Sequence, residues 1–219
     1  STVDVESGKL SVKMDRPAET YTITLLDSTN SEVGQGFERV DPAFNLGLTE
    51  VTWEAMSDDI AVIQVDGLDV YGFTTQTRLF PWSYDIPHED VIFASNQSTI
   101  PAEEVYKLTD VQQEVIKVVK KYSQFAVVNL YVAGYTDTVG DAGHNLQLSS
   151  QRAKSIGTWF KKNGFEGNIY YQGFGESVLA VPTADGVDEA ANRRVLYVVA
   201  ATAPTSQGSF PNAKWKPLP

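Results

Sequence analysis

The chain has 219 residues, 42% of them hydrophobic, and it contains no cysteine. This length suits two domains of about 90 to 130 residues each, and the apolar content supports ordinary folded cores. Because the chain has no cysteine, disulfides, thiolate nucleophiles and cysteine metal sites are excluded. No apolar run approaches the ~20 residues that cross a bilayer, and the start Ser1-Thr2-Val3-Asp4 lacks the pattern of a signal peptide. We expect a soluble chain from which any export signal or lipid anchor has been removed or was never present.

Acidic residues are concentrated in the first part of the chain. Residues 1–88 carry 15 Asp and Glu against 5 Lys and Arg, whereas residues 89–219 carry 13 against 12. A net charge of −10 repels nucleic acid, and the second part offers no basic stripe to bind it instead. The sequence predicts no nucleic-acid partner, and this acidity is more typical of solubility than of recognition.

The first part has the alternation of half-buried strands. Residues 10–14 and 21–25 place apolar side chains at every second position, and turn residues bound each run. Further strands are expected at 51–55, 60–65 and 70–73. The pattern predicts a small all-β, sandwich-like domain over residues 1–80, and its role is unknown because no motif in it carries chemistry.

Two proline-containing segments flank the second part. Residues 81–89 contain two prolines and several aromatic side chains, so we expect an extended, packed junction. His88 within it is expected to be a surface residue, because no second ligand stands at metal spacing. The tail, residues 202–219, contains four prolines and is expected to run over the surface, with Phe210 and Trp215 docking it on one of the domains.

Residues 90–201 change to helical periodicity mixed with apolar strands. Leu108, Val111, Val115, Val118 and Tyr122 recur at spacings of three and four, which predicts a helix. A second helix is expected to start near Ser149 or Ser150 and to stop at Asn163-Gly164. Strands are predicted at 91–93, 127–133, 169–173 and 195–199. The expected fold is α+β, with β-α-β-α-β-β order and two helices on a mixed sheet.

Two opposite charges are predicted to meet at one edge of this sheet. Asp137 follows the central strand, and Arg152 lies on the helix after it, so a right-handed crossover places both at the same edge. The carboxylate accepts hydrogen bonds from an ammonium group, and the guanidinium donates to a carboxylate. Asn145 between them supplies further hydrogen bonds or braces its loop. The pair can therefore bind the two charges of a zwitterion.

Five motifs occur in order through this second part: Phe93-Ala-Ser-Asn96-Gln-Ser98, Gly134-Tyr135-Thr136-Asp137-x-x-Gly140, Asn145-x-x-Leu148-Ser149-x-x-Arg152-Ala153, Gly173-Phe174-Gly175-Glu176-Ser177 and Asn192-Arg193-Arg194-Val195. With this set, residues 90–200 resemble the OmpA-like peptidoglycan-binding domain of outer-membrane proteins, peptidoglycan-associated lipoproteins and flagellar stator subunits. The resemblance covers about half of the chain and does not extend to residues 1–85.

The resemblance implies a set of binding residues. Asp137 and Arg152 match the residues that bind the free amino-acid end of diaminopimelate in the peptidoglycan stem peptide. Asn96, Thr136, Asn145 and Arg193 match positions nearby. The chain departs from the family at Tyr135, where histidine is common, and in a longer first connection, which affects the assignment of Asn96.

Other residues near these motifs are expected to be structural. Arg194 points to the face opposite Arg193, because neighbouring strand residues alternate. Glu176 is expected to brace a loop or a helix start, and Gly173 and Gly175 to form a bend. His144 stands isolated in a glycine-rich loop.

The sequence thus favours a non-enzymatic envelope protein that binds peptidoglycan and anchors to the cell wall, in the periplasm and associated with the outer membrane of a Gram-negative cell. No cofactor or metal is expected. One alternative is a cell-wall hydrolase that uses Asp137 and Glu176 as acid and base. Another is an envelope scaffold whose acidic β-domain binds a protein partner.

Overall fold

The computed structural model describes residues 2–94, 96–204 and 209–219 and divides into two compact units, Ser1–Trp82 and Ser83–Pro219. Ser95, within the first of the five motifs, and residues 205–208 of the predicted tail lie outside the described residues. Neither of the two α-helices in the described ranges is both long and apolar enough to span a membrane. The units are described in turn.

The first unit consists of two antiparallel sheets, which confirms the all-β prediction. One sheet has the order β1 (Thr2–Asp4), β2 (Lys9–Val12), β5 (Thr49–Thr52). The other has the order β6 (Glu54–Ala55), β4 (Glu32–Arg39), β3 (Ala18–Leu26), β7 (Val62–Asp69), β8 (Thr74–Leu79). A 3-10 turn, η1 (Pro42–Phe44), precedes β5. The core lies between the sheets, where alternate residues of β3 pack with Leu10, Val51 and Trp53.

Three strands of this unit, β1, β4 and β8, were not predicted, and the strand predicted at residues 70–73 is wrong. Strand β4 contains Gly34 and Gly36, whose missing side chains admit the carbonyl oxygens of Glu54 and Thr52; a Cβ would lie 2.3 and 2.2 Å from them. Because β4 carries glycine at these inward positions, it lacks the apolar alternation that marks a strand. Residues 70–73 form the turn between β7 and β8, where Asp69 Oδ1 accepts from the amides of Tyr71 and Phe73.

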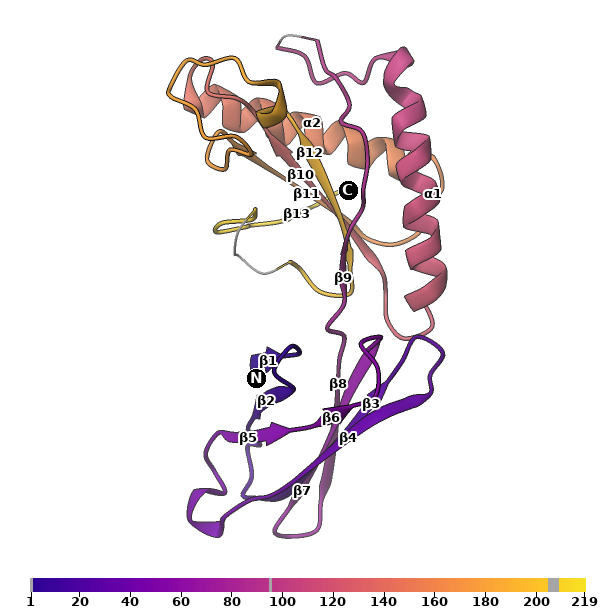
Figure 1. Ribbon diagram of the computed structural model, residues 1–219, viewed down its shortest axis with the longest axis vertical. Helices are drawn as coiled ribbons and strands as arrows, with labels where there is room; N and C mark the ends of the chain where they lie inside the picture. The colour runs from indigo at the N-terminus through magenta and orange to yellow at the C-terminus, as the bar shows by residue number, and fades with distance from the viewer. Residues whose placement is uncertain (1, 95, 205–208) are drawn as a thin grey trace. The chain divides into compact units, whose positions relative to one another are not determined.

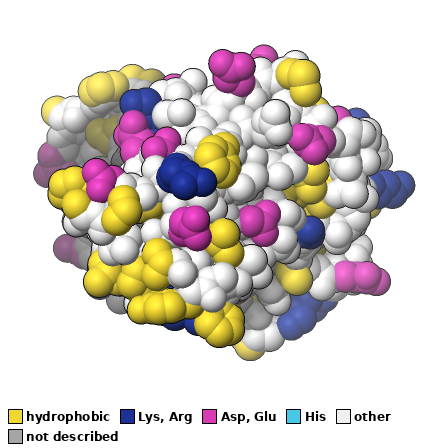
Figure 2. Space-filling view, turned by 90° about the horizontal axis from the view of Figure 1, so that it is seen from below, with side chains coloured by type: hydrophobic (Ala, Val, Ile, Leu, Met, Phe, Trp, Pro, Cys, Tyr) yellow, Lys and Arg dark blue, Asp and Glu magenta, His cyan; other side chains and the backbone are white. Residues whose placement is uncertain are grey.

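Figure 2 looks at the lower end of the view in Figure 1 and shows apolar side chains gathered along one side of that face. Six exposed large apolar residues of the first unit lie in two places, at the end of η1 with the loop after it and in the turn between β7 and β8. They are Phe44, Leu46, Leu48, Val70, Tyr71 and Phe73. The guanidinium of Arg16 lies 4.9 Å from the Phe73 ring centre, so this aromatic side chain is partly covered by a cation.

The second unit is a mixed five-stranded sheet with two long helices (Figure 1). The sheet order is β13 (Lys216–Pro217), β11 (Ile169–Gly175), β10 (Asn129–Tyr135), β12 (Val195–Ala200), β9 (Ser83–Asp85). Strands β10 and β11 are parallel, and the other pairs are antiparallel. The helices are α1 (Val105–Tyr122) and α2 (Ala142–Lys162), with 3-10 turns η2 (Ala102–Glu104) and η3 (Ala190–Asn192). This arrangement confirms the α+β fold with a mixed sheet.

Helix α2 lies against the strands at unusually short range. A Cβ on Gly134 of β10 would lie 2.3 Å from the carbonyl oxygen of Ser149, and one on Gly173 of β11 would lie 2.2 Å from the amide nitrogen of Ser150. Ser149 is fully buried, and its hydroxyl accepts from the amide of Gly175 at 2.9 Å. The two glycines therefore fix where α2 crosses the parallel strands.

The other face of the sheet is covered by the C-terminal segment. Phe210 and Trp215 pack on Tyr131, Tyr135 and Phe174, which point away from the helices. Strand β13 then pairs with β11 and extends the sheet. The aromatic side chains of residues 209–217 thus form a third layer over the mixed sheet.

Three predictions about the second unit are wrong. Residues 91–93 are not a strand; the first strand of the sheet is β9, which pairs with β12. Helix α2 begins at Ala142, capped by Asp141, and not near Ser149, because the Gly-rich first turns carry few apolar residues. The side chain of His88 is only 9% exposed and is not a surface group.

His88 joins the segment after β9 to the start of β12. Its Nδ1 lies 2.6 Å from the carbonyl oxygen of Ile86 and its Nε2 lies 2.6 Å from that of Val195. Both partners are acceptors, so the ring must donate from both nitrogens, and only the imidazolium form can do so. Burial by itself lowers the pKa of His88, but Asp90 and the two carbonyls outweigh it and raise the pKa above its usual value.

This geometry predicts a pH-dependent contribution of His88 to stability. A folded-state pKa above the unfolded value gives stabilisation that is complete below the unfolded value of about 6.5 and is lost as pH rises through the folded pKa. His88→Gln should therefore lower the free energy of unfolding more at about pH 5.5 than at about pH 9. Urea denaturation at both pH values measures this. His144→Gln, which replaces the chain's other histidine, is the control, and an equal loss at both pH values for His88→Gln would contradict the assignment.

Removing Trp215, the central aromatic residue of the third layer, is predicted to lower the stability of the second unit. Trp215→Ala should lower the free energy of unfolding of the second unit by about 2 to 3 kcal/mol, because it uncovers Tyr131 and Phe174. Lys214→Ala, an exposed neighbour, should change it by less than about 0.5 kcal/mol. Chemical denaturation followed by aromatic fluorescence and circular dichroism measures both. Equal stability of the two variants would show that the segment does not support the sheet.

Candidate ligand-binding pocket

The pocket lies where β10 ends and α2 begins. Asp137 follows the last residue of β10 by two positions, and Gly140, with φ of +101°, turns the chain toward the helix. Asp141 caps α2 by accepting from the amide of His144 at 2.9 Å. Because α2 starts earlier than the sequence predicts, Asn145 lies on its first turns and Arg152 lies about three turns from its start.

All six residues predicted for the site line one cavity of about 350 Å³. The lining residues come from the segment after β10, from α2, from positions Phe93 and Asn96 and from the residues before β12. The lining is Phe93, Asn96, Thr136, Asp137, Val139, His144, Asn145, Leu148, Arg152, Asp188 and Arg193. The fold therefore brings residues from four separate parts of the sequence to one place.

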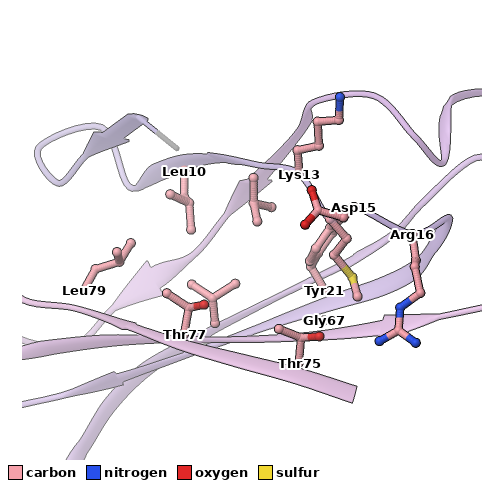
Figure 3. A pocket seen from close by; sticks show the side chains of 12 residues that line it. Leu10, Lys13, Asp15, Arg16, Tyr21, Gly67, Thr75, Thr77 and Leu79 are labelled. Atoms are coloured by element: carbon pink, nitrogen blue, oxygen red, sulfur yellow. The ribbon is translucent and has the colours of Figure 1, made fainter. Parts of the chain in front are cut away.

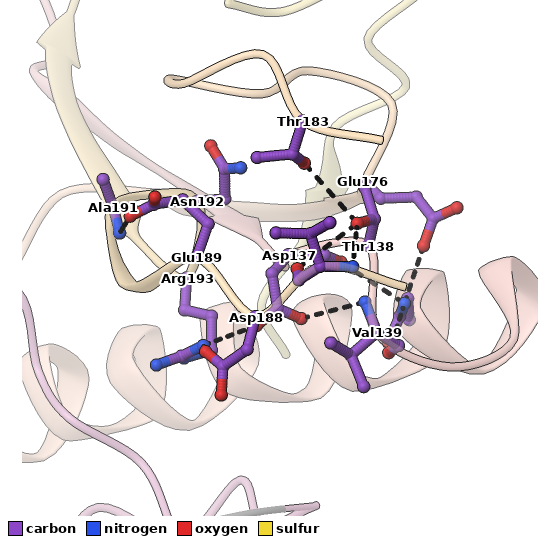
Figure 4. A network of polar contacts seen from close by, with 12 residues as sticks. Asp137, Thr138, Val139, Glu176, Thr183, Asp188, Glu189, Ala191, Asn192 and Arg193 are labelled. Carbon is purple, nitrogen blue, oxygen red and sulfur yellow. Dashed lines mark hydrogen bonds and ion pairs between the residues drawn. The ribbon is translucent and has the colours of Figure 1, made fainter. Parts of the chain in front are cut away.

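Asp137 is 7% exposed and is held in an ion pair with Arg193. Arg193 Nη1 donates to Asp137 Oδ2 at 2.5 Å and also to Asp188 Oδ1, as Figure 4 shows. Asp188 and Asp137 together raise the pKa of Arg193. The other oxygen of Asp137, Oδ1, accepts, among the described residues, only a 3.3 Å contact from the amide of Val139. One side of the Asp137 carboxylate thus remains able to accept a stronger hydrogen bond.

Arg152 is 6% exposed, and it holds the loop that forms the opposite wall. Its Nε donates to the carbonyl of Gln97 at 3.0 Å, and its Nη2 lies 3.4 Å from the carbonyl of Ala94. The guanidinium lies 5.0 Å from the ring centre of Phe93. Burial, followed by the nearby charge of Arg193, lowers the pKa of Arg152. An arginine nevertheless stays protonated in proteins, so the pocket wall carries a buried positive charge.

The two buried opposite charges are not paired with each other. Among the described residues, the ion-pair partner of Asp137 is Arg193, and the hydrogen-bond partners of Arg152 are neutral carbonyl groups. Neutral carbonyls satisfy the donors of Arg152 but do not cancel its charge. The pocket therefore suits a ligand that carries a carboxylate group as well as an ammonium group.

The remaining predicted residues either brace the pocket or face into it. Asn145 Nδ2 donates to the carbonyl of Val139 at 3.1 Å and to Glu176 Oε2 at 2.7 Å. Thr136 is 2% exposed, and its hydroxyl has no hydrogen-bond partner among the described residues. Asn96 adopts a left-handed φ of +56°, and its Oδ1 lies 2.7 Å from His144 Nε2. Asn145 is thus a brace, whereas Thr136 offers an unused donor and acceptor.

Five lining residues were not assigned to the site from sequence: Phe93, Val139, His144, Leu148 and Asp188. His144 was taken as an isolated loop residue, although it lies on α2 and contacts Asn96. Asp188 lies in an irregular loop with no motif, and only its charge close to Arg193 could have indicated the contact. Phe93 was read as a strand residue, whereas it stacks under Arg152.

The residues expected to be structural lie outside the pocket lining. Arg194 is over the Tyr135 ring, 4.2 Å from its centre, on the sheet face opposite Arg193. Glu176 accepts from Asn145. Within the described ranges, no group of three His, Asp or Glu side chains is arranged to hold a metal ion.

Residues 92–193 match the OmpA family. The outer-membrane lipoprotein YfiB of Pseudomonas aeruginosa is 28% identical over 149 residues, which cover 66% of this chain and 78% of that protein. Outer membrane protein A of Shimwellia blattae is 36% identical over 104 residues, which cover 47% of this chain and 41% of that protein. Among solved structures, the peptidoglycan-associated lipoprotein from Burkholderia pseudomallei is 21% identical with a TM-score of 0.40, covering 50% of this chain and 88% of that one.

The bracing role of Asn145 predicts a stability effect. Asn145→Ala leaves the carbonyl of Val139 and the carboxylate of Glu176 without this donor, so the free energy of unfolding should fall by about 1 to 3 kcal/mol. Gln147→Ala on the exposed side of the same helix should change it by less than about 0.5 kcal/mol. Thermal and urea denaturation measure both variants. An unchanged Asn145→Ala variant would mean that Asn145 serves the ligand alone.

Proposed function

Because residues 92–193 are an OmpA-family domain, we propose that this chain binds peptidoglycan without covalent attachment and anchors an envelope protein to the cell wall. The similarity to an outer-membrane lipoprotein and to outer membrane protein A supports a place in the Gram-negative envelope. The proposed location is the periplasm, at the outer membrane.

The proposed ligand is the free amino-acid end of a diaminopimelate-type stem peptide. One observation carries this proposal: Asp137 and Arg152 are both buried in one cavity, and neither neutralises the other. In the bound state, the ligand carboxylate accepts from Arg152, and the ligand ammonium donates to Asp137 Oδ1. Charge-assisted hydrogen bonds of this kind are about twice as strong as neutral ones.

The neighbouring residues complete this proposed site. Arg193 can keep its contact with Asp137 Oδ2 while the ammonium uses Oδ1, and Asp188 supplies a second negative charge beside the same guanidinium. The free hydroxyl of Thr136 and the exposed pair Asn96 and His144 lie where the rest of the stem peptide would pass. The bound ligand therefore adds contacts to the ion pairs of Arg193 with Asp137 and Asp188 and breaks neither of them.

The hydrolase alternative has less support from this geometry. A glycosidase needs one carboxylic acid that can protonate the leaving group. Asp137 and Asp188 are both engaged in ion pairs with Arg193, and Glu176 accepts a hydrogen bond from Asn145 and does not line the pocket. We propose a binding domain without catalytic activity.

The proposal predicts that both buried charges are needed. Asp137→Asn and Arg152→Gln keep size and polarity but each remove one charge, and each should weaken binding to purified sacculi and to the stem peptide by at least ~30-fold, corresponding to about 2 to 5 kcal/mol. Sedimentation with sacculi and calorimetry with the peptide measure this. Asp185→Asn, an exposed carboxylate outside the pocket lining, is the control and should bind as wild type.

A second peptide separates recognition of the two charges. Lysine in place of diaminopimelate removes the distal carboxylate but keeps the ammonium, so wild type should bind it more weakly, and Arg152→Gln should no longer distinguish the two peptides. Undiminished binding by both charge variants would refute the site. Soluble muropeptides released over hours by wild type, but not by Asp137→Asn, would favour the hydrolase instead.

A further inference from the structure

Strand β8 leaves a long free edge on the first unit. It is the last strand of the five-stranded sheet, it pairs only with β7, and it has six residues, Thr74–Leu79. The other edge strands formed by the described residues have two to four residues. Every residue of β8 except Leu79 is exposed. The backbone groups on its outer side therefore have no strand to pair with in this part of the chain.

This edge lacks the features that usually prevent strand addition. Proteins protect free edges with proline, lysine, bulges or very short strands. Strand β8 contains no proline or lysine, and its pairing with β7 runs without a register shift. Its one charged residue, Arg78, is bound to Gln64 of β7, with Nη2 donating at 3.0 Å. The edge is thus open to a further strand.

An open cavity of about 340 Å³ lies beside β8, and Figure 3 shows the side chains that line it. Thr75, Thr77 and Leu79 form one wall, and Leu10 reaches toward them from the opposite wall. Its lining is Leu10, Val12, Lys13, Met14, Asp15, Arg16, Tyr21, Val65, Gly67, Thr75, Thr77 and Leu79. The lining residues of β2 and those of β8 occupy every second position of their strands, so each set points to one face of its sheet, toward the cavity.

A buried polar group lies in this cavity without a partner. Tyr21 is 1% exposed and lines the cavity, and its hydroxyl has no hydrogen-bond partner among the described residues. A buried hydroxyl that makes no hydrogen bond costs free energy. The cavity wall thus combines apolar side chains with the charged side chains of Lys13, Asp15 and Arg16.

We propose that the edge of β8 binds an extended segment of a partner protein, which adds a sixth strand to the sheet. The segment pairs its backbone with β8 and places alternate apolar side chains into the cavity, while its outward side chains are basic. Basic residues are favoured because the unit Ser1–Trp82 carries 14 Asp and Glu against 5 Lys and Arg. Backbone pairing supplies affinity, and the cavity supplies specificity.

The same charge argues against a second copy of this chain as the occupant. Pairing β8 with β8 of another copy would bring together two units with a net charge of −9 each. In that pairing the cavity would receive only the Thr and Leu side chains of the other copy's β8. These are the same kinds of side chain that already form one of its walls. A basic partner segment avoids the charge repulsion and can supply apolar side chains for the cavity. Self-association of the chain is a measurable outcome.

The test uses the full chain and a capped heptapeptide that alternates Lys and Val, with Lys at both ends. A peptide of the same composition with its three Val residues together is the control for charge alone. Wild type should bind the alternating peptide at least about 10-fold more tightly, and hydrogen exchange should show protection of the β8 amides on binding. Equal binding of the two peptides, or no protection at about 1 mM peptide, would overturn the proposal.

Two variants of the same strand locate the site. Thr77→Phe fills the cavity from the inner face and should weaken binding of the alternating peptide by at least about 10-fold, whereas Thr74→Phe on the outer face should bind as wild type. Circular dichroism verifies folding of both, and the exchange protection in wild type decides the matter if Thr77→Phe does not fold. Equal binding by the two variants would overturn the proposal. Dimerisation of the free chain would also overturn the proposal if Thr77→Phe abolished it, because the edge would then bind a second copy.

Discussion

The candidate site depends on the close contact between α2 and the parallel strands. Gly134 and Gly173 leave no room for side chains, so the backbone at Ser149 and Ser150 lies directly on β10 and β11. This contact fixes the first half of α2 beside the ends of both strands. Asn145 can then brace the segment after β10, and Arg152 can reach the loop at residues 93–97. A side chain at either glycine would push the helix outward and separate the two walls of the pocket.

The sequence was most informative where chemistry and local pattern coincide. Asp137 follows a nearly continuous apolar strand, so its position at a strand end could be predicted, as could the stop of α2, where Gly164 adopts a φ of +91°. The start of α2 could not, because Ser149 and Ser150 have the side chains of a helix cap but are buried in mid-helix. The strands β4 and β8 escaped prediction because glycine in one and threonine in the other replace apolar alternation.

The pocket was predicted only in part because its walls come from distant segments. The six predicted residues all line it, and all six stand in motifs that carry the family resemblance. Asp188 and His144 have no such pattern, and their places follow from contacts across 5 and 48 positions, to Arg193 and Asn96. Such pairings depend on loop conformation, which hydrophobic periodicity does not encode.

Strand β9 has a mechanical consequence for a tether. The chain leaves the first unit at Trp82 and immediately enters β9, so tension between that unit and a ligand in the pocket is carried into the second unit through this strand. The three residues of β9 that pair with β12 would by themselves separate under low force. The next segment adds two contacts: His88 hydrogen-bonds the carbonyl of Val195, and the amide of Ile86 donates to the carbonyl of Tyr197. Resistance to pulling is governed by the rate at which such contacts open. Under such a pull the load on the second unit would fall on this strand and on the few hydrogen bonds around His88.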